Sequence, residues 1–218
     1  SIEHINFKFF DELIIVSLEN KSNEKFLNFL RSISGSLDIP LVISGGIEHL
    51  DDARRFFDLG ADRLIINRGL WNNPGIFEEI ANLYGIQAVI ASIDCLFKNN
   101  CILSYDWERK VTRNCLIPTY MNEIAPFIGE LFIQDVQRDG RIIGANIELI
   151  KRVKNLINLD IPFHIGSCGI VSWQQYVELL KEQDVDAISV NNIHHMSSIA
   201  NQTLRDCCIV NDLEIRSP

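Results

Sequence analysis

Short apolar runs alternate with amphipathic stretches along this chain of 218 residues, and this alternation limits its fold more than any other feature. The apolar runs, rich in Ile and Val, predict strands buried on both faces, at 13–18, 40–44, 63–66, 88–93, 130–133, 163–165 and 187–190. The amphipathic stretches predict helices, at 23–37, 50–59, 74–84, 118–127, 146–157, 172–182 and 196–207. This order favours a parallel sheet with helices outside it, in a single domain over residues 1–218.

An internal repeat distinguishes two arrangements of such a sheet. The segment at 39–47 (IPLVISGGI), with the strand at 61–68, resembles the segment at 161–170 (IPFHIGSCGI), with the strand at 185–192. The two copies lie 122 to 124 residues apart, which is about half of a (β/α)8 barrel of ~250 residues. A TIM-barrel type fold built of two similar half-barrels is therefore favoured over an open doubly wound sheet. A full barrel needs one more strand, so we expect that the first strand is missing from this chain.

Composition and charge narrow the class of protein. With 47% apolar residues the chain fits a folded, soluble protein. No apolar stretch reaches the ~20 residues of a membrane-spanning helix, and no leader segment opens the sequence, so we expect a cytoplasmic protein without a membrane partner. The formal charge of -9 disfavours a nucleic-acid partner, although a small phosphorylated ligand needs only local donors.

The spacing of cysteines and histidines predicts neither a metal nor a cofactor. The six cysteines include no C-x-x-C pair. His194 and His195 are adjacent and point in different directions, whereas His164 lies in an apolar strand and is expected to be a satisfied interior histidine. The segment 99–114 is typical of a hairpin or a mobile flap, and Trp107 within it is expected to be a packing residue.

Polar side chains come at the ends of several predicted strands. Asn67 and Asp94 end two of them, and Asp139 lies in the loop after the next. The carboxyl ends of the strands carry the active site in barrels of this type, and paired carboxylates there can act as general acid and base. A helix-capping role for either aspartate is the alternative.

Glycine-rich turns follow two strands at equivalent places in the halves. One turn carries Gly45 and Gly46, and the other carries Ser167, Cys168 and Gly169. Glycines at such turns let backbone N–H groups approach an anion near the start of a helix. Two equivalent turns predict two phosphate sites.

Charged residues begin three alternate strands. Glu12, Arg63 and Glu130 occupy the same place in DEL, DRL and GEL. Side chains from alternate strands share one layer of a barrel, so we expect these three to converge at its N-terminal end. A structural ion pair is one interpretation of this layer.

Three longer segments together resemble a known family. They are 40–67 (PLVISGGI, then DDARRFFDLGADRLIIN), 84–94 (YGIQAVIASID) and 137–153 (QRDGRIIGANIELIKRV). They are similar to the cyclase subunit of imidazole glycerol phosphate synthase. The resemblance covers essentially the whole chain and implies an eightfold barrel of two similar halves, in agreement with the internal repeat.

The resemblance also implies roles for residues at the barrel mouth. In that family two aspartates close an imidazole ring, using ammonia delivered from a glutaminase. The resemblance implies that Asp94 is one of this pair, Asp139 a further functional aspartate and Asn67 a supporting amide. The other aspartate of the pair belongs to the first strand and has no counterpart here. Ser17 and Gln137 stand where the family usually carries aspartate.

The family binds a ligand with a phosphate at each end, one in each half, and this implies a phosphate at each glycine turn. The second turn is altered, because Cys168 adds a side chain where the family has glycine. Asn191 and Asn192 end the last strand where the family has small residues and a serine. They could donate to phosphate or narrow the pocket.

A charged ring at the bottom of the family's barrel is a gate, through which ammonia enters and over which the glutaminase docks. The resemblance implies this role for Glu12, Arg63 and Glu130, with Arg63 in place of the usual lysine. We therefore expect a cyclase-type lyase that works with a glutaminase subunit, as a heterodimer, on a phosphorylated small molecule. Two alternatives stay open. One is a paralogue that supplies ammonia for an amidino sugar of surface polysaccharide, and the other is a non-catalytic barrel that binds and activates a glutaminase.

Overall fold

The computed structural model describes residues 10–17, 24–107, 109–114, 117–141, 143–157, 160–166, 169–182, 185–190 and 206–213. Within them a parallel sheet has the strand order β1-β2-β3-β4-β7-β8-β9. Its strands are β1 (Leu13–Val16), β2 (Leu41–Ser44), β3 (Arg63–Ile66), β4 (Val89–Lys98), β7 (Glu130–Asp135), β8 (Phe163–Gly166) and β9 (Ala187–Ser189). Every predicted strand is present, and each pairs with its predicted neighbour along the chain.

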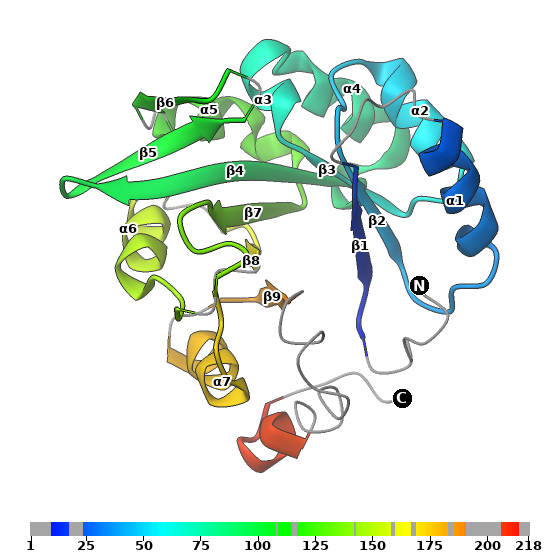
Figure 1. The fold of residues 1–218 in the computed structure, drawn as a ribbon. Helices are drawn as coiled ribbons and strands as arrows, with labels where there is room; N and C mark the ends of the chain where they lie inside the picture. Colours follow the sequence, from blue (N-terminus) through cyan, green and yellow to red (C-terminus); the bar gives the residue numbers. More distant parts are fainter. Residues whose placement is uncertain are drawn as a thin grey trace.

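Helices follow the outside of the curved sheet (Figure 1). They are α1 (Glu24–Ser34), α2 (Leu50–Asp58), α3 (Arg68–Asn72), α4 (Gly75–Tyr84), α5 (Ile117–Ile124), α6 (Ile147–Ile157) and α7 (Trp173–Glu182), with short 3-10 turns η3 (Ile86–Ala88) and η4 (Ala125–Phe127). The architecture is an α/β barrel of TIM type, as predicted. The short helix α3 was not predicted. Most of the last predicted helix, 196–207, lies outside the described residues. Residues 206–210 are described and helical.

Alternation along the strands gives the sheet two different faces. One face joins the helices in a large apolar core that includes Leu30, Phe56 and Phe77, all fully buried. The other face contributes a separate, smaller cluster of strand residues, made of Val42, Ile65, Ile90 and Phe132, with Ile14 packed against it. Because no helix residue belongs to this smaller cluster, it is the inner layer of the barrel.

The segment after the predicted strand at 88–93 continues that strand beyond the barrel. Strand β4 pairs with β7 as far as Cys95 and then turns back into β5 (Cys101–Asp106), which pairs antiparallel with β6 (Val111–Asn114). Asn99 and Asn100 form the two-residue turn, with φ of 51° and 63°. Left-handed conformations at both turn positions suit Asn and match the twist of a tight hairpin. The predicted hairpin is confirmed.

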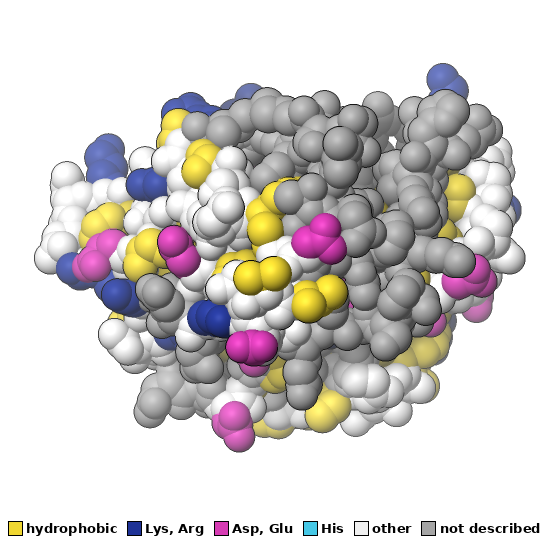
Figure 2. Space-filling view, turned by 90° about the horizontal axis from the view of Figure 1, so that it is seen from below, with side chains coloured by type: hydrophobic (Ala, Val, Ile, Leu, Met, Phe, Trp, Pro, Cys, Tyr) yellow, Lys and Arg dark blue, Asp and Glu magenta, His cyan; other side chains and the backbone are white. Residues whose placement is uncertain are grey.

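The molecular surface carries charges of both signs. On the face in Figure 2, the described Asp and Glu side chains are spread among apolar and uncharged ones, and Lys and Arg lie mainly toward the left. Neither sign forms one continuous block among the described side chains of this face. In the described part of the chain, no helix combines the length and the apolar character needed to cross a bilayer.

We expect Gly166→Ala to destabilise the inner layer. A Cβ at Gly166 would lie 2.5 Å from the Phe132 ring, which is itself buried. Overpacking of this kind typically costs about 1–3 kcal/mol, because the ring must leave its rotamer or the strands must separate. The midpoint of denaturant unfolding measures the loss.

Gly35→Ala is the matched control, because a Cβ there has no atom within 4 Å. Adding Phe132→Leu to Gly166→Ala should recover part of the loss. Equal unfolding midpoints for the two single variants would contradict this account of the inner layer.

Candidate functional site

Asn67 and Asp94 meet at the carboxyl ends of neighbouring strands. Asn67 follows β3, and its Nδ2 donates to the Asp94 Oδ2 at 3.2 Å and to the Ser92 carbonyl oxygen at 3.1 Å. Asp94 lies within β4 and is 7% exposed. The parallel pairing of β3 with β4 brings these two predicted site residues together.

Asp139 lies beside the same site because β7 is the next strand. Asp94 pairs in register with Gln134. The Gln134 Nε2 donates to the Asp139 Oδ2 at 2.8 Å, and the Asp139 N–H donates to the Asp135 carbonyl oxygen at 2.9 Å. These bonds hold the Asp139 carboxylate close enough to Asp94 for their charges to interact.

The environment of Asp94 changes its acidity. Burial raises the pKa of Asp94 from 3.8 to about 7, and the nearby Asp139 charge acts in the same direction. Hydrogen bonds from the side chains of Trp107 and Asn67 oppose the increase, because they stabilise the charged form. Asp94 can therefore bind and release a proton near neutral pH.

Trp107 is a site residue that the sequence reasoning missed. It was expected to be a packing residue, but it is 56% exposed, lines a cavity together with Asn67, and lowers the pKa of Asp94. Its position just after β5, in a hairpin that extends β4, was the available signal. The cavity here has a volume of about 40 Å³ and is lined by Asn67, Arg68, Trp71, Asn72, Asp106 and Trp107.

The first glycine turn packs tightly against the end of β1. Gly45 has φ 129° and Gly46 has φ 67°, and a Cβ at Gly45 would lie 2.5 Å from the Ser17 carbonyl oxygen. The predicted anion site lies near the start of α2. However, the Asp52 carboxylate already accepts hydrogen bonds from the backbone N–H groups of Glu48 and His49.

Only part of the second turn can be placed. Ser167 and Cys168 lie outside the described residues, as do Asn191 and Asn192 at the end of the last strand. Gly169 has φ 76°, and a Cβ there would lie 2.9 Å and 3.0 Å from the carbonyl oxygens of Arg141 and Arg138, respectively. The loop that carries Asp139 therefore packs against Gly169.

The three charged residues predicted at the other end of the barrel do converge. The Arg63 Nη1 lies 3.1 Å from the Glu12 Oε2, and its Nη2 lies 2.5 Å from the Glu130 Oε2. The Arg63 Nε also donates to the Gln87 carbonyl oxygen at 3.1 Å. Burial would lower the pKa of Arg63, but the two carboxylates raise it, so the guanidinium stays charged.

His164 adds a fourth member to this charged layer. Its Nδ1 lies 2.5 Å from the Glu130 Oε1, and its ring packs edge-on against Phe132 with centroids 4.7 Å apart. Burial would raise the pKa of Glu130, but His164 and Arg63 lower it below its usual value. The Nε2 of His164 is buried and has no hydrogen-bond partner among the described residues, so the prediction of a satisfied histidine is only half right.

Glu12, Glu130 and His164 also hold three ligand-type atoms within 4.8 Å of one another. The Arg63 guanidinium already pairs with both carboxylates, so it supplies the positive charge that a metal ion would bring. The histidines His194 and His195 lie outside the described residues.

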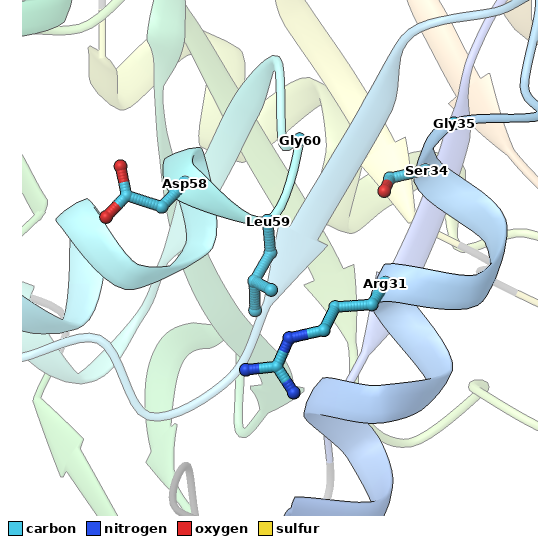
Figure 3. Close-up of a pocket in the computed structure, with 6 residues that line it drawn as sticks. All are labelled: Arg31, Ser34, Gly35, Asp58, Leu59 and Gly60. Atoms are coloured by element: carbon cyan, nitrogen blue, oxygen red, sulfur yellow. The ribbon is translucent and has the colours of Figure 1, made fainter.

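A larger cavity lies away from all of these residues (Figure 3). It has a volume of about 480 Å³ and is lined by Arg31, Ser34, Gly35, Asp58, Leu59 and Gly60. These residues end α1 and α2 and lead into β2 and β3, so the cavity opens toward the N-terminal ends of the strands. No predicted site residue lines it.

We expect Asp94→Asn to stabilise the protein at pH 8 but not at pH 4. The folded state holds the Asp94 proton up to about pH 7, whereas the carboxyl has its ordinary pKa of 3.8 in the unfolded chain, where it is exposed to water. The wild type therefore loses stability as the pH rises through this window, by at most on the order of 4 kcal/mol at 1.36 kcal/mol per pKa unit. Denaturant unfolding of both proteins from pH 4 to pH 8 measures the difference, and parallel pH curves would contradict the assignment.

Comparison with known proteins places the chain in a family. The family described as histidine biosynthesis protein matches residues 1–200. The imidazole glycerol phosphate synthase subunit HisF of Exiguobacterium sibiricum is 25% identical over 210 residues, which cover 94% of this chain and 82% of the relative. A putative subunit hisF2 of the same synthase, from Parasynechococcus marenigrum, is 30% identical over 193 residues, which cover 85% of this chain and 69% of the relative. The putative subunit hisF2 of Prochlorococcus marinus is 30% identical over 172 residues, which cover 73% of this chain and 62% of the relative. The chain therefore belongs to the histidine biosynthesis protein family, as a divergent member related to the cyclase subunit of imidazole glycerol phosphate synthase.

Proposed function

We propose that this chain is the ammonia-using subunit of a glutamine amidotransferase system, acting on a phosphorylated small molecule as imidazole glycerol phosphate synthase does. The observation that carries the proposal is the buried Asp94, whose pKa is raised to about 7 beside Asn67 and Asp139. A group that titrates near neutral pH is well suited to general acid–base catalysis. Its place at the carboxyl end of a barrel strand is the place where barrel enzymes carry their chemistry.

In this proposal Asp94 moves protons while ammonia adds to the acceptor. The ionised carboxylate accepts a proton from the attacking nitrogen, and the protonated carboxyl returns it to the departing oxygen. Asn67 fixes the orientation of the Asp94 carboxyl through its 3.2 Å hydrogen bond. Asp139, held by Gln134, favours the protonated form of Asp94 through charge repulsion.

The glycine turns serve as phosphate subsites in this proposal. Gly45 and Gly46 adopt positive φ values that let the backbone approach an anion closely. Because Asp52 already bonds the N–H groups of Glu48 and His49, a phosphate must be held by the turn itself. Ser167, Cys168, Gly169, Asn191 and Asn192 form the proposed second subsite.

The charged layer of Glu12, Arg63 and Glu130 is the proposed ammonia entrance. It lies at the N-terminal ends of the strands, and the inner apolar layer separates it from Asp94. Neutral ammonia crosses an apolar layer at far smaller cost than ammonium does. A glutaminase docked over this end would deliver ammonia along the barrel axis.

A different acceptor is the second candidate, and the replaced carboxylates favour it. Ser17 and Gln137 stand where the resembled family usually has aspartate, and the Gln137 Oε1 accepts a hydrogen bond from the Phe97 N–H at 3.2 Å. With fewer carboxylates at the mouth, ammonia addition to a sugar in an amidino-sugar pathway becomes a candidate reaction. A barrel that only binds and activates a glutaminase is the non-catalytic alternative.

We expect Asp94→Asn to lower ammonia-dependent turnover by about 10²–10⁴-fold, because a positioned acid–base group contributes that much. The assay supplies an ammonium salt at pH 8 and the doubly phosphorylated nucleotide substrate of the synthase, and mass spectrometry detects the imidazole product. Asp160→Asn is the matched control, because Asp160 is exposed and precedes β8, at the end of the barrel opposite to Asp94.

Three outcomes separate the candidates. Turnover that falls only in Asp94→Asn supports the synthase-type reaction. Binding of the substrate without product points to a different acceptor. Failure of the wild type to bind the substrate at all, with a glutaminase still bound, favours the non-catalytic alternative.

We expect Arg63→Glu to weaken glutaminase binding at least tenfold. The change places a third carboxylate beside Glu12 and Glu130 and breaks both ion pairs of the layer. Pull-down and calorimetry with the glutaminase encoded beside this chain measure the affinity.

Arg54→Glu is the charge-matched control, because Arg54 is an exposed partner of Asp51 on helix α2. Arg63→Lys keeps the positive charge, so it separates an effect of the charge reversal from an effect of unfolding. Circular dichroism checks that each variant is folded. If the wild type and the three variants bind the glutaminase equally, the charged layer is not part of the docking surface.

A further inference from the structure

His164 lies at the boundary between the charged layer and the inner apolar layer. Its Nδ1 lies 2.5 Å from the Glu130 Oε1, on the charged side. It also pairs in register with Phe132 of the inner layer, and the two rings meet edge-on. The His164 side chain is buried, so the two layers meet at this ring.

A histidine is unexpected at this place in the barrel. In the internal repeat, the segment 161–166 (IPFHIG) corresponds to the segment 39–44 (IPLVIS), so His164 stands where the first half has Val42. Val42 belongs to the inner apolar layer and is fully buried. A valine at position 164 would leave no polar atom in need of a partner. The second half of the barrel therefore carries a buried polar group that the first half lacks.

The Nε2 of His164 is a buried acceptor with no donor. The Glu130 carboxylate pairs with Arg63 through its other oxygen, and its pKa lies below the usual value, so it is ionised and can only accept hydrogen bonds. The His164 Nδ1 that contacts it therefore carries the proton. In the neutral ring Nε2 then has no proton and offers a lone pair. This atom has no hydrogen-bond partner among the described residues, which is unfavourable unless a donor binds there.

Neutral ammonia suits this acceptor better than water or ammonium does. A buried water typically needs roughly two to four polar partners, whereas the His164 ring is flanked by Phe132 and offers one free nitrogen. An ammonium ion needs an unpaired carboxylate, but the oxygens of Glu12 and Glu130 already bind Arg63 or the imidazole. Ammonia is uncharged, so it can remain beside apolar side chains at a smaller cost.

We propose that the His164 Nε2 is the hydrogen-bond acceptor for ammonia where it leaves the charged layer and enters the inner apolar layer. Ammonia donates one N–H to Nε2 and keeps all its protons and its lone pair, so no covalent bond changes. His164 is thus a positioning residue in the passage and takes no part in the chemistry at Asp94. The inference rests on the proposed function in naming ammonia, whereas the unpartnered acceptor is a feature of this chain itself.

The first test uses the chain alone and needs no turnover. Nitrogen NMR of the histidine rings at pH 9, with the His164 signals assigned by His164→Asn, should show a proton on Nδ1 and none on Nε2. Ammonium chloride supplies neutral ammonia at this pH and should shift the Nε2 signal to saturation. Potassium chloride at the same concentration is the control, and the difference between the salts should shrink at pH 7, where neutral ammonia is scarce. A proton on Nε2 at pH 9, or equal shifts with both salts, overturns the inference.

The second test separates the acceptor from the ion pair with Glu130. In His164→Asn the amide nitrogen lies as many bonds from the backbone as Nδ1, so it still donates to Glu130, but nothing replaces Nε2. In His164→Gln the amide lies at the distance of Nε2, and its carbonyl oxygen can accept from ammonia. In the complex with the glutaminase, product formed per glutamine hydrolysed should fall about fivefold in His164→Asn, the effect of one hydrogen bond, and less in His164→Gln.

Denaturant unfolding checks that both variants are folded. An unchanged yield in His164→Asn, or an equal fall in both variants, contradicts the acceptor role, because each result leaves His164 as a member of the ion-pair cluster alone.

The inference and the proposed function can fail separately. If ammonium chloride shifts the Nε2 signal but the complex forms no product, the acceptor stands and the synthase-type function fails. If the complex forms product but the Nε2 signal responds equally to both salts, the proposed function stands and the role of His164 is wrong.

Discussion

The inner apolar layer is the constraint on which the rest of the structure depends. Val42, Ile65, Ile90 and Phe132, with Ile14, fill the barrel interior between its two ends. Polar groups above and below this layer cannot reach water through the middle of the barrel, so each end must satisfy its own charges. This explains why an aspartate at one end carries a raised pKa and why charges at the other end are paired.

The charged end shows how buried charges are compensated next to this apolar interior. Two carboxylates, Glu12 and Glu130, face one guanidinium and one imidazole, and each neighbour of Glu130 lies 2.5 Å from one of its oxygens. Removing one partner from such a cluster leaves an uncompensated buried charge, which costs more than the pair itself contributes. His164 thus extends an ion pair between strands into a cluster that joins β8 to the others.

The other end is built from a barrel and an attached hairpin. Parallel pairing of β4 with β7 sets Asp94 beside Gln134, the side chain of Asn67 after β3 bonds Asp94, and Gln134 in turn holds Asp139. The hairpin that continues β4 then adds Trp107 from outside the barrel. The site therefore combines side chains from the barrel strands with a side chain from a hairpin outside the barrel.

The sequence by itself determined the periodic features of this protein. Apolar runs predicted the parallel strands, and the internal repeat predicted the barrel. The equal positions of Glu12, Arg63 and Glu130 predicted their convergence, because strand alternation is a local property of the chain. Only the tertiary structure decided which side chains from distant segments share a buried space. His164 was expected to be satisfied and Trp107 to be a packing residue, since neither periodicity nor spacing shows that one faces Glu130 and the other Asp94. The raised pKa of Asp94 has the same origin, because burial and the charge of Asp139 act only once the strands are assembled.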